Sequence, residues 1–529
     1  MWLIQVTLQI NRWSPYFLSI LKIIAAFVYG VRGTQKLGGQ EDTSGGVAYA
    51  RRTTILCISL LLSLTSSAQQ KPSPLSPYVK EDAPVLVLEH VRLIDGTGSA
   101  PKEDMRIDIA GGKITAVQAA SAHSPYPANA KVLDMTGKTV IPGLVGMHEH
   151  LFYPTPQQPQ GGVAFYGEAP DSAPRLYLAG GVTTARTGGS MEPYTDLELK
   201  RKIDAGLLPG PKLDVTGPYL EGKGSFAVQM HALADADDAA RTVDYWAAEG
   251  VTSFKAYNYI TADELKAAID HAHAHGLKIT GHLCSIGFRQ AAALGIDNLE
   301  HGLSVDTEFY PGRKPDECPG LLANLEYIEK SVEVEGPEVR ETIRDLVAHH
   351  VAITSTLAVF ETLGSKRPPM ERESAALKTL SPQAAKEYLA GRSQVAEHDV
   401  GGPMLGKEMR FEREFMAAGG LLTAGCDPTG YGGVVPGFGD QRNIELLVEA
   451  GFSPVEAIRI ATLNGAIYMG RDASIGSIAP GKAADLVVLG GDPAVKIENM
   501  EKVELVFKDG VGFDPAKLIQ SATELVGLR

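Results

Sequence analysis

Short apolar runs that each end in polar residues recur through the middle of the chain, between residues 141 and 470. Helical signals lie between most of these runs, and in the clearest helix Thr261 and Glu264 form a capping box and Gly276 ends the helix. Because strands that alternate with helices form parallel sheets, eight such units predict an α/β fold, a (β/α)8 TIM-type barrel. The expected strands are 144–148, 182–186, 213–217, 252–255, 278–282, 298–301, 351–356 and 421–427.

Strand-like segments flank this region on both sides. We therefore expect one small β-sandwich domain built from both ends of the mature chain, residues 85–140 and 471–529, beside a barrel at 141–470. Residues 69–84 include a stretch rich in proline and serine and are expected to form a linker. The β-rich runs are 85–98, 113–117 and 131–135 before the barrel, and 484–489 and 503–507 after it.

The segment 51–68 has the three parts of a secretory signal peptide. It begins with Arg51 and Arg52, continues through the apolar residues 55–64, and ends in small residues that suit signal peptidase. The apolar part is too short to span a bilayer comfortably. The sequence therefore predicts an exported protein, periplasmic or extracellular, that begins near Gln69 and whose mature domain has no stable membrane insertion.

Residues 1–50 form an N-terminal extension with two interpretations. Residues 14–31 are apolar apart from Lys22, and they allow a membrane-anchoring helix. Alternatively, the translation start is assigned too early and the true start lies near Arg51. We favour the second interpretation, because a signal peptide normally lies at the extreme N-terminus.

The charge balance and the cysteines narrow the functional classes. Lys and Arg total 49 and Asp and Glu total 63, so the net charge is −14. An acidic chain argues against a nucleic-acid partner, because phosphates attract basic patches. The four cysteines include no CxxC pair, so neither a zinc finger nor a disulfide scaffold is indicated. Cys284 and Cys426 are expected to be buried free thiols.

Polar side chains at the ends of the expected strands form the candidate site, because barrels of this kind carry their active sites at the C-terminal ends of the strands. His148 and His150 are two residues apart on the first strand, so both can face the barrel axis. Neutral imidazoles and carboxylates suit Zn²⁺ and similar divalent ions. The convergence of the whole strand-end series predicts a metal site; its members are His148, His150, Lys255, His282, His301 and Asp427.

Lys255 is the unusual member of this series, because an ammonium group has no lone pair for a metal ion. In a pocket of low dielectric constant a lysine can lose its proton, and the free amine can then react with CO₂ to form a carbamate. A carboxylated Lys255 could bridge two metal ions, whereas the unmodified side chain would repel them.

The motifs around these residues follow a recognisable pattern. Residues 141–150 read IPGLVGMHEH, and the later strand ends read FKAY, TGHL, LEHG and AGCDP around Lys255, His282, His301 and Asp427. Together with ATLNGA at 461–466 and GSIAPGKAADLV at 476–487, this pattern resembles the amidohydrolase superfamily, most of all its imidazolonepropionase-like and Xaa-Pro dipeptidase-like members. A minor departure is Glu149, which stands where the family often has Asp, Ala or Thr.

The resemblance implies a pair of divalent metal ions, usually zinc, bridged by carboxylated Lys255. His148, His150 and Asp427 would hold one ion, and His282 and His301 the other. A hydroxide shared by the two ions would attack a polarised carbonyl group. Asp427 would be the catalytic residue, which moves a proton to the leaving nitrogen.

The predicted function is hydrolysis of a C–N bond in a small-molecule substrate such as a dipeptide, an N-acyl amino acid or a cyclic amide. Ester, lactone or phosphoester hydrolysis on the same metal pair is one alternative, and an inactive metal-binding protein is another. Arg186 could bind a substrate carboxylate through its planar fork or form a salt bridge at the barrel end. Tyr257 and Tyr259, which follow Lys255, are further candidate substrate contacts. The sequence leaves the oligomeric state open, including a homo-oligomer.

Overall fold

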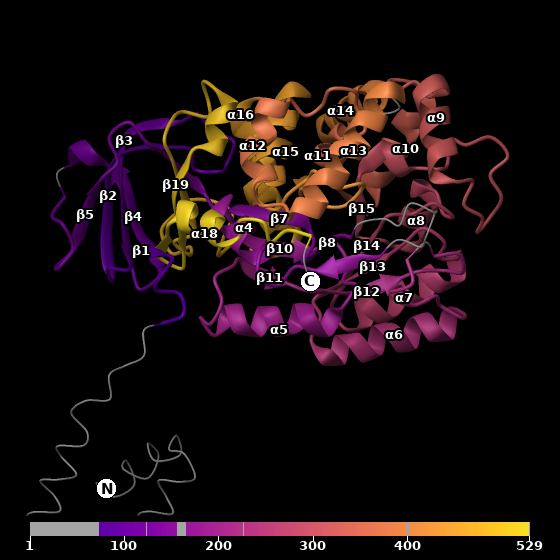
Figure 1. The fold of residues 1–529 in the computed structure, drawn as a ribbon, viewed down its shortest axis with the longest axis horizontal. Coiled ribbons are helices and arrows are strands. Elements are labelled where there is room, and N and C mark those ends of the chain that lie inside the picture. The colour runs from indigo at the N-terminus through magenta and orange to yellow at the C-terminus, as the bar shows by residue number, and fades with distance from the viewer. Residues whose placement is uncertain (1–72, 123, 156–164, 226, 399–401, 528–529) are drawn as a thin grey trace, which may run out of the picture. The chain divides into compact units, whose positions relative to one another are not determined.

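The computed structural model describes residues 73–122, 124–155, 165–225, 227–398 and 402–527 (Figure 1). The expected signal peptide at 51–68 and the apolar stretch 14–31 lie outside these residues. In the part of the chain that the structure describes, no helix is both long and apolar enough to cross a lipid bilayer.

Parallel strands form the centre of a TIM-barrel domain, and each expected strand is present. The third expected strand is divided at Val215: its first part pairs with the second barrel strand, and its second part pairs with the fourth. After the last strand, the Asp427 N–H donates to the His148 carbonyl of the first (3.0 Å). The strands are β7 (Leu144–Glu149), β10 (Val182–Thr187), β11 (Lys212–Asp214), β12 (Thr216–Leu220), β13 (Ser253–Ala256), β14 (Lys278–Gly281), β15 (Asn298–Glu300), β16 (Ala352–Ser355) and β17 (Leu422–Ala424).

Helix α7 (Ala262–Ala274) shows how the local sequence sets the helix ends. The Thr261 hydroxyl accepts from the Glu264 N–H (3.3 Å), and the Glu264 carboxylate accepts from the Thr261 N–H (2.8 Å), which confirms the capping box. The helix buries Leu265 and Ile269 against the barrel. Gly276, with φ of +70°, follows the helix end in the left-handed conformation that glycine tolerates.

The other helices lie around the outside of these strands (Figure 1). Those that precede β16 are α4 (Ala173–Ala179), α5 (Pro193–Asp204), α6 (Ala236–Glu249), α8 (Phe288–Leu294), α9 (Leu321–Ser331) and α10 (Pro337–Ala348). The later ones are α11 (Leu357–Glu361), α12 (Met370–Leu377), α13 (Pro382–His398), α14 (Gly402–Ala417), α15 (Phe438–Glu449), α16 (Pro454–Arg459), α17 (Gly465–Tyr468) and α18 (Pro515–Ser521). Short helical turns are η2 (Ala120–Ala122), η3 (Gly302–Val305), η4 (Ile460–Asn464) and η5 (Ile497–Glu501).

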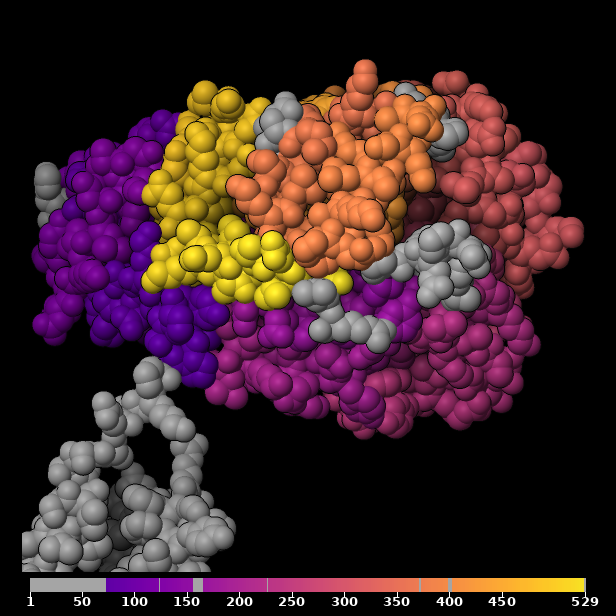
Figure 2. Space-filling view, in the orientation of Figure 1, coloured from indigo at the N-terminus to yellow at the C-terminus, as the bar shows by residue number. Residues whose placement is uncertain are grey.

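The β-domain joins the two ends of the described chain, as expected. β18 (Leu486–Leu489) pairs antiparallel with β6 (Thr139–Pro142), and the apolar side chains of both segments share one core. Figure 2 shows the indigo and yellow segments side by side in this region. The remaining strands are β1 (Val79–Glu81), β2 (Val85–Leu93), β3 (Lys102–Ala110), β4 (Lys113–Ala119), β5 (Lys131–Asp134), β19 (Val503–Lys508) and β20 (Val511–Phe513).

Two details of this domain differ from the expectation. Hydrogen bonds connect all of its strands into one nine-stranded sheet, in which β2 pairs with β3 on one edge and with both β5 and β6 on the other. Part of the expected linker is a strand, because β1 pairs antiparallel with β20. A strand of only three residues is too short to show the alternation of apolar and polar positions from which strands are predicted.

Candidate metal centre

The structure brings all six strand-end residues to one cavity of about 50 Å³. His148 and His150 alternate with Glu149 on β7, so the two imidazoles face the cavity and the glutamate points away from it. Lys255 lies on β13, and the others directly follow strands. His282 follows β14, His301 follows β15 and Asp427 lies three residues after β17. His282 is partly exposed and the other five are buried.

The ring nitrogens and the carboxylate converge on a common point. His150 Nε2 lies 3.2 Å from Asp427 Oδ1, and His148 Nε2 lies 3.8 Å from the same oxygen. His301 Nε2 lies 3.8 Å from Asp427 Oδ2. The Lys255 Nζ is 3.4 Å from His148 Nε2. This spacing is what a set of ligands around one or two ions requires.

Hydrogen bonds behind the histidines orient them for metal binding. His148 Nδ1 lies 2.9 Å from the Glu300 carboxylate, which only accepts hydrogen bonds, so Nδ1 is the donor and Nε2 is the nitrogen that faces the cavity. His301 Nδ1 lies 2.6 Å from the Thr356 hydroxyl. His150 Nδ1 lies 3.4 Å from the Gly189 carbonyl. Support of this kind is characteristic of histidines that ligate metals.

The electrostatics of the cavity favour ligand forms of the side chains. Burial lowers the pKa of His150 to about 4 and that of His282 to about 3, so both imidazoles are neutral near pH 7. Burial also opposes ionisation of Asp427, but the neighbouring histidines outweigh it and hold its pKa well below the usual range. Burial lowers the pKa of Lys255 to about 8, although Glu300 and Asp427 oppose the shift. The free amine that reaction with CO₂ requires is therefore more accessible than in an ordinary lysine.

One unsatisfied atom supports the fit to a metal ion. Nε2 of His282 is buried and has no hydrogen-bond partner among the described residues. An orphaned buried nitrogen of this kind costs free energy, and a divalent ion in the cavity would satisfy it. The imidazole and carboxylate donors also match the preferences of Zn²⁺. The residues present therefore fit divalent metal ions.

Backbone strain accompanies two of the ligands. His301 and Asp427 have φ of +70° and +50°, in the left-handed region that non-glycine residues rarely adopt. Such conformations cost about 1–3 kcal/mol and collect at functional sites. Nearby, position 425 requires a glycine for a steric reason, because a Cβ there would lie 2.3 Å from the His148 backbone nitrogen.

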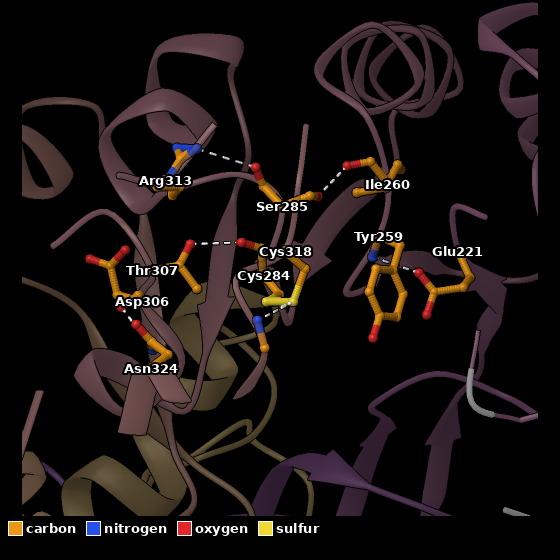
Figure 3. The surroundings of a disulfide bond; sticks show 11 residues. Glu221, Tyr259, Ile260, Cys284, Ser285, Asp306, Thr307, Arg313, Cys318 and Asn324 are labelled. Carbon is orange, nitrogen blue, oxygen red and sulfur yellow. Dashed lines mark hydrogen bonds between the residues drawn. A yellow bond between two sulfur atoms is a disulfide. The ribbon is translucent and has the colours of Figure 1, made fainter. Parts of the chain in front are cut away.

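Of the two tyrosines predicted to contact substrate, one lines the cavity and the other does not. Tyr257 lines the cavity, and its ring lies 5.0 Å from that of His282 between centroids. Tyr259 is not among the cavity-lining residues, and its backbone N–H donates to the Glu221 carboxylate (2.7 Å; Figure 3).

Arg186 lies inside the barrel and does not line the cavity. It forms a buried salt bridge instead. It donates to Glu300 Oε1 (2.6 Å) and, through Nε, to the Met147 carbonyl (2.8 Å). We therefore withdraw Arg186 as a substrate contact. Its partner, Glu300, is not among the residues predicted from the sequence, although a charged residue inside a buried strand, directly before His301, was a signal for it.

The cysteines correct one expectation. Cys284 is not a free thiol but forms a disulfide with Cys318, 34 residues later (Figure 3). No spacing motif marks the pair, because the contact is made between loops that follow neighbouring strands. The bond secures the chain two residues beyond His282, where the Thr307 hydroxyl also donates to the Cys284 carbonyl (2.7 Å). Cys426 is free and buried, as expected.

Comparison with known proteins identifies the class to which this barrel and site belong. Residues 139–512 match the amidohydrolase family, and the chain belongs to that family. It is accordingly a hydrolase that acts on carbon–nitrogen bonds.

Individual relatives agree with this assignment. The imidazolonepropionase of Geobacillus kaustophilus is 23% identical over 368 residues, which cover 68% of this chain and 77% of the relative. Adenine deaminase 2 of Jannaschia sp. is 40% identical over 76 residues, 14% of this chain and 12% of the relative.

Solved structures share the fold. A Bifidobacterium longum protein described as a prolidase is 25% identical, with a TM-score of 0.58 over 84% of this chain and 100% of that chain. Phenylurea hydrolase B is 20% identical, with a TM-score of 0.60 over 84% of this chain and 100% of that chain.

Proposed function

We propose that this protein is an amidohydrolase that depends on two divalent metal ions, of which Zn²⁺ fits the donors best. The observation that carries the proposal is the convergence of four imidazoles, Lys255 and Asp427 on one cavity at the C-terminal ends of the barrel strands. We assign His148, His150 and Asp427 to one ion, and His282 and His301 to the other. Carboxylated Lys255 would bridge the two ions.

The chemistry follows from these assignments. Bound divalent ions would polarise a carbonyl group and lower the pKa of water. Asp427 lies within 4 Å of three imidazoles and is ionised, so it is placed to accept a proton from the attacking water. It would then deliver the proton to the leaving nitrogen as the C–N bond breaks. Glu300 and Thr356 hold His148 and His301 in place meanwhile.

The substrate belongs to the range that hydrolysis of C–N bonds allows: a dipeptide, an N-acyl amino acid or another amide. The names of the relatives, prolidase, Xaa-Pro dipeptidase, imidazolonepropionase and phenylurea hydrolase, support amide-like substrates.

We also propose that the protein acts outside the cytoplasm. The signal-peptide pattern at 51–68 supports this location. The disulfide between Cys284 and Cys318 supports it independently, because such bonds persist mainly in oxidising compartments.

The test is substitution of Lys255 in the full-length, zinc-loaded protein. Lys255→Ala should bind less than half of the wild-type zinc and lose more than about 100-fold in kcat/KM, since the bridging group is absent. Reconstitution of the metal-free wild type with Zn²⁺ should proceed further with added bicarbonate than without it. The measurements are zinc content by atomic emission and amide hydrolysis by release of amine.

Lys278→Ala is the matched control, because Lys278 lies at the start of β14 and its Nζ donates to the Tyr468 carbonyl, outside the cavity. It should retain its zinc. A Lys255→Ala protein with full zinc content and wild-type turnover would rule out the bridging role.

A further inference from the structure

The cavity wall beyond the metal ligands is apolar and largely aromatic. These side chains come from the β8–β9 hairpin, formed by β8 (Phe152–Pro154) and β9 (Tyr166–Glu168), from β12 itself, and from the segments that follow β10, β12 and β13. Most of them form one hydrophobic cluster. The wall residues are Phe152, Tyr166, Met191, Tyr219, Met230 and Tyr257, and the polar Thr429 completes the lining.

This aromatic wall is in direct contact with the histidines. The Phe152 ring stacks on the His150 ring at 4.3 Å between centroids. The Tyr257 ring meets the His282 ring at 5.0 Å and the Tyr219 ring at 4.9 Å. A substrate whose carbonyl reaches the metal ligands therefore also touches this wall.

Charge is almost absent from the lining. Among the described residues that line the cavity, Lys255 is the one Lys or Arg and Asp427 the one carboxylate, and both belong to the metal centre. Arg186 does not line the cavity, and its guanidinium group is held by Glu300.

The wall also contains phenol hydroxyls, among them those of Tyr166 and Tyr219. They offer hydrogen-bond donors to an oxygen of the substrate but no compensation for a full negative charge. A carboxylate buried against this wall would lose its hydration without gaining a cationic side chain, which is unfavourable.

We propose that the substrate is an uncharged amide that carries an aromatic ring beside the scissile bond, and not a dipeptide or N-acyl amino acid with a free carboxylate. This inference rests on the proposed function. Water adds to the amide carbonyl, the C–N bond breaks, and the nitrogen leaves as an amine with the proton from water. The ring would pack against the face that Phe152, Tyr219 and Tyr257 form, and the flexible side chains of Met191 and Met230 would have to move to make room for it.

The test compares two nearly isosteric amides on zinc-loaded, full-length protein. N-propylbenzamide and N-benzoylglycine share the same benzoyl group and scissile bond, and differ mainly in a terminal carboxylate. We expect kcat/KM for N-propylbenzamide to exceed that for N-benzoylglycine by at least about tenfold, measured by release of benzoate. Glycylproline, a dipeptide, should be hydrolysed more slowly still.

A pair of variants tests the wall directly. Met230→Arg adds a cation to the lining and should shift the ratio of the two rates at least about tenfold towards N-benzoylglycine. Met230→Leu is the matched control, because it preserves volume and apolarity, and it should keep the wild-type preference. The comparison on wild-type protein does not depend on whether Met230→Arg folds.

The possible failures point to different conclusions. Equal or faster hydrolysis of N-benzoylglycine or glycylproline by the wild type would overturn the substrate inference and leave the proposed function intact. An unchanged rate ratio in folded, zinc-loaded Met230→Arg would also overturn it. If the zinc-loaded wild type hydrolysed none of the three compounds, that result would count against the proposed function itself.

Discussion

Strand β7 lies between two buried clusters of potential metal donors, one beside each of its faces. The inner cluster, His148, His150 and Asp427, faces the cavity. The outer cluster contains Glu149, Cys426 and Asp440, the last of these from α15. Within each cluster the donor atoms lie within 4.8 Å of one another, so proximity alone does not distinguish a metal centre from a structural network.

The difference lies in how the donors are already occupied. In the outer cluster, the Cys426 thiol and backbone N–H both donate to the Glu149 carboxylate (3.0 and 3.3 Å), and Asp440 accepts from the Gly437 N–H (2.9 Å). The Glu149 carboxylate also fills the space beside Gly146, where a Cβ would lie 2.4 Å from Oε1. In the inner cluster the donors instead surround a cavity. A metal centre therefore requires unfilled space and free lone pairs as well as donor types.

The two clusters also differ in protonation: the carboxyl groups of the outer cluster tend to keep their protons, whereas Asp427 of the inner cluster is ionised. Burial, with Asp440 nearby, raises the pKa of Glu149 well above its usual value, and burial also raises the pKa of Asp440 and of Cys426. The outer cluster therefore retains protons and uses them in hydrogen bonds. Asp427 is ionised, as a ligand must be. The outer cluster connects the ends of β7 and β17, and so it positions the backbone that carries the inner one.

The most direct test of this comparison replaces one aspartate of each cluster by asparagine. Asp427→Asn should lower kcat by about 10²–10⁴-fold, because the amide cannot accept the proton of the attacking water. Asp440→Asn, the matched control, should retain most of its kcat and its zinc. The measurements are kcat and zinc content of the two variants side by side. A similar loss of kcat in both would mean that the clusters do not divide catalysis and structure as proposed.

A smaller effect is expected from Glu300, which connects the inner cluster to the barrel interior. Its carboxylate accepts from His148 and Arg186, and from the Thr280 hydroxyl (2.6 Å). Glu300→Gln should weaken zinc binding by about 10–100-fold, since the support behind His148 is altered. It should also destabilise the fold by about 3–5 kcal/mol, because the Arg186 charge is left buried without its partner.

The double variant Arg186→Met with Glu300→Gln separates these two roles of Glu300. Removing both charges should restore much of the free energy of unfolding without restoring zinc affinity. Zinc titration and chemical denaturation of the three proteins measure the two quantities independently. Recovery of full zinc affinity in the double variant would show that Glu300 acts on the metal centre only through the stability of the fold.

Local patterns made the barrel and the strand-end residues predictable, and distant contacts did not follow from them. The strands and the capping box at Thr261 depend on residues a few positions apart, so their signals survive in the sequence alone. The pairing of Arg186 with Glu300 spans 114 positions, and the disulfide between Cys284 and Cys318 joins two separate loops. The neutrality of the cavity wall likewise emerges only when several segments are brought together.

The smallest expected effect concerns the stability of the outer cluster and its dependence on pH. Because the pKa of Glu149 is raised in the folded state, the folded protein holds a proton that the unfolded chain releases above its ordinary pKa. Stability is therefore lost as pH rises through the interval between the unfolded and folded pKa values, by up to about 1.4 kcal/mol per pH unit for one group.

Glu149→Gln removes this proton linkage and keeps one side-chain carbonyl oxygen as a hydrogen-bond acceptor. Thermal unfolding of the metal-free wild type and variant between pH 6 and pH 9 should show the variant gaining stability relative to the wild type as pH rises. Parallel curves for the two proteins would mean that Glu149 ionises in the folded state much as it does in the unfolded chain. The two faces of β7 would then not differ in protonation, and the contrast between a proton-holding outer cluster and an ionised inner cluster would fail.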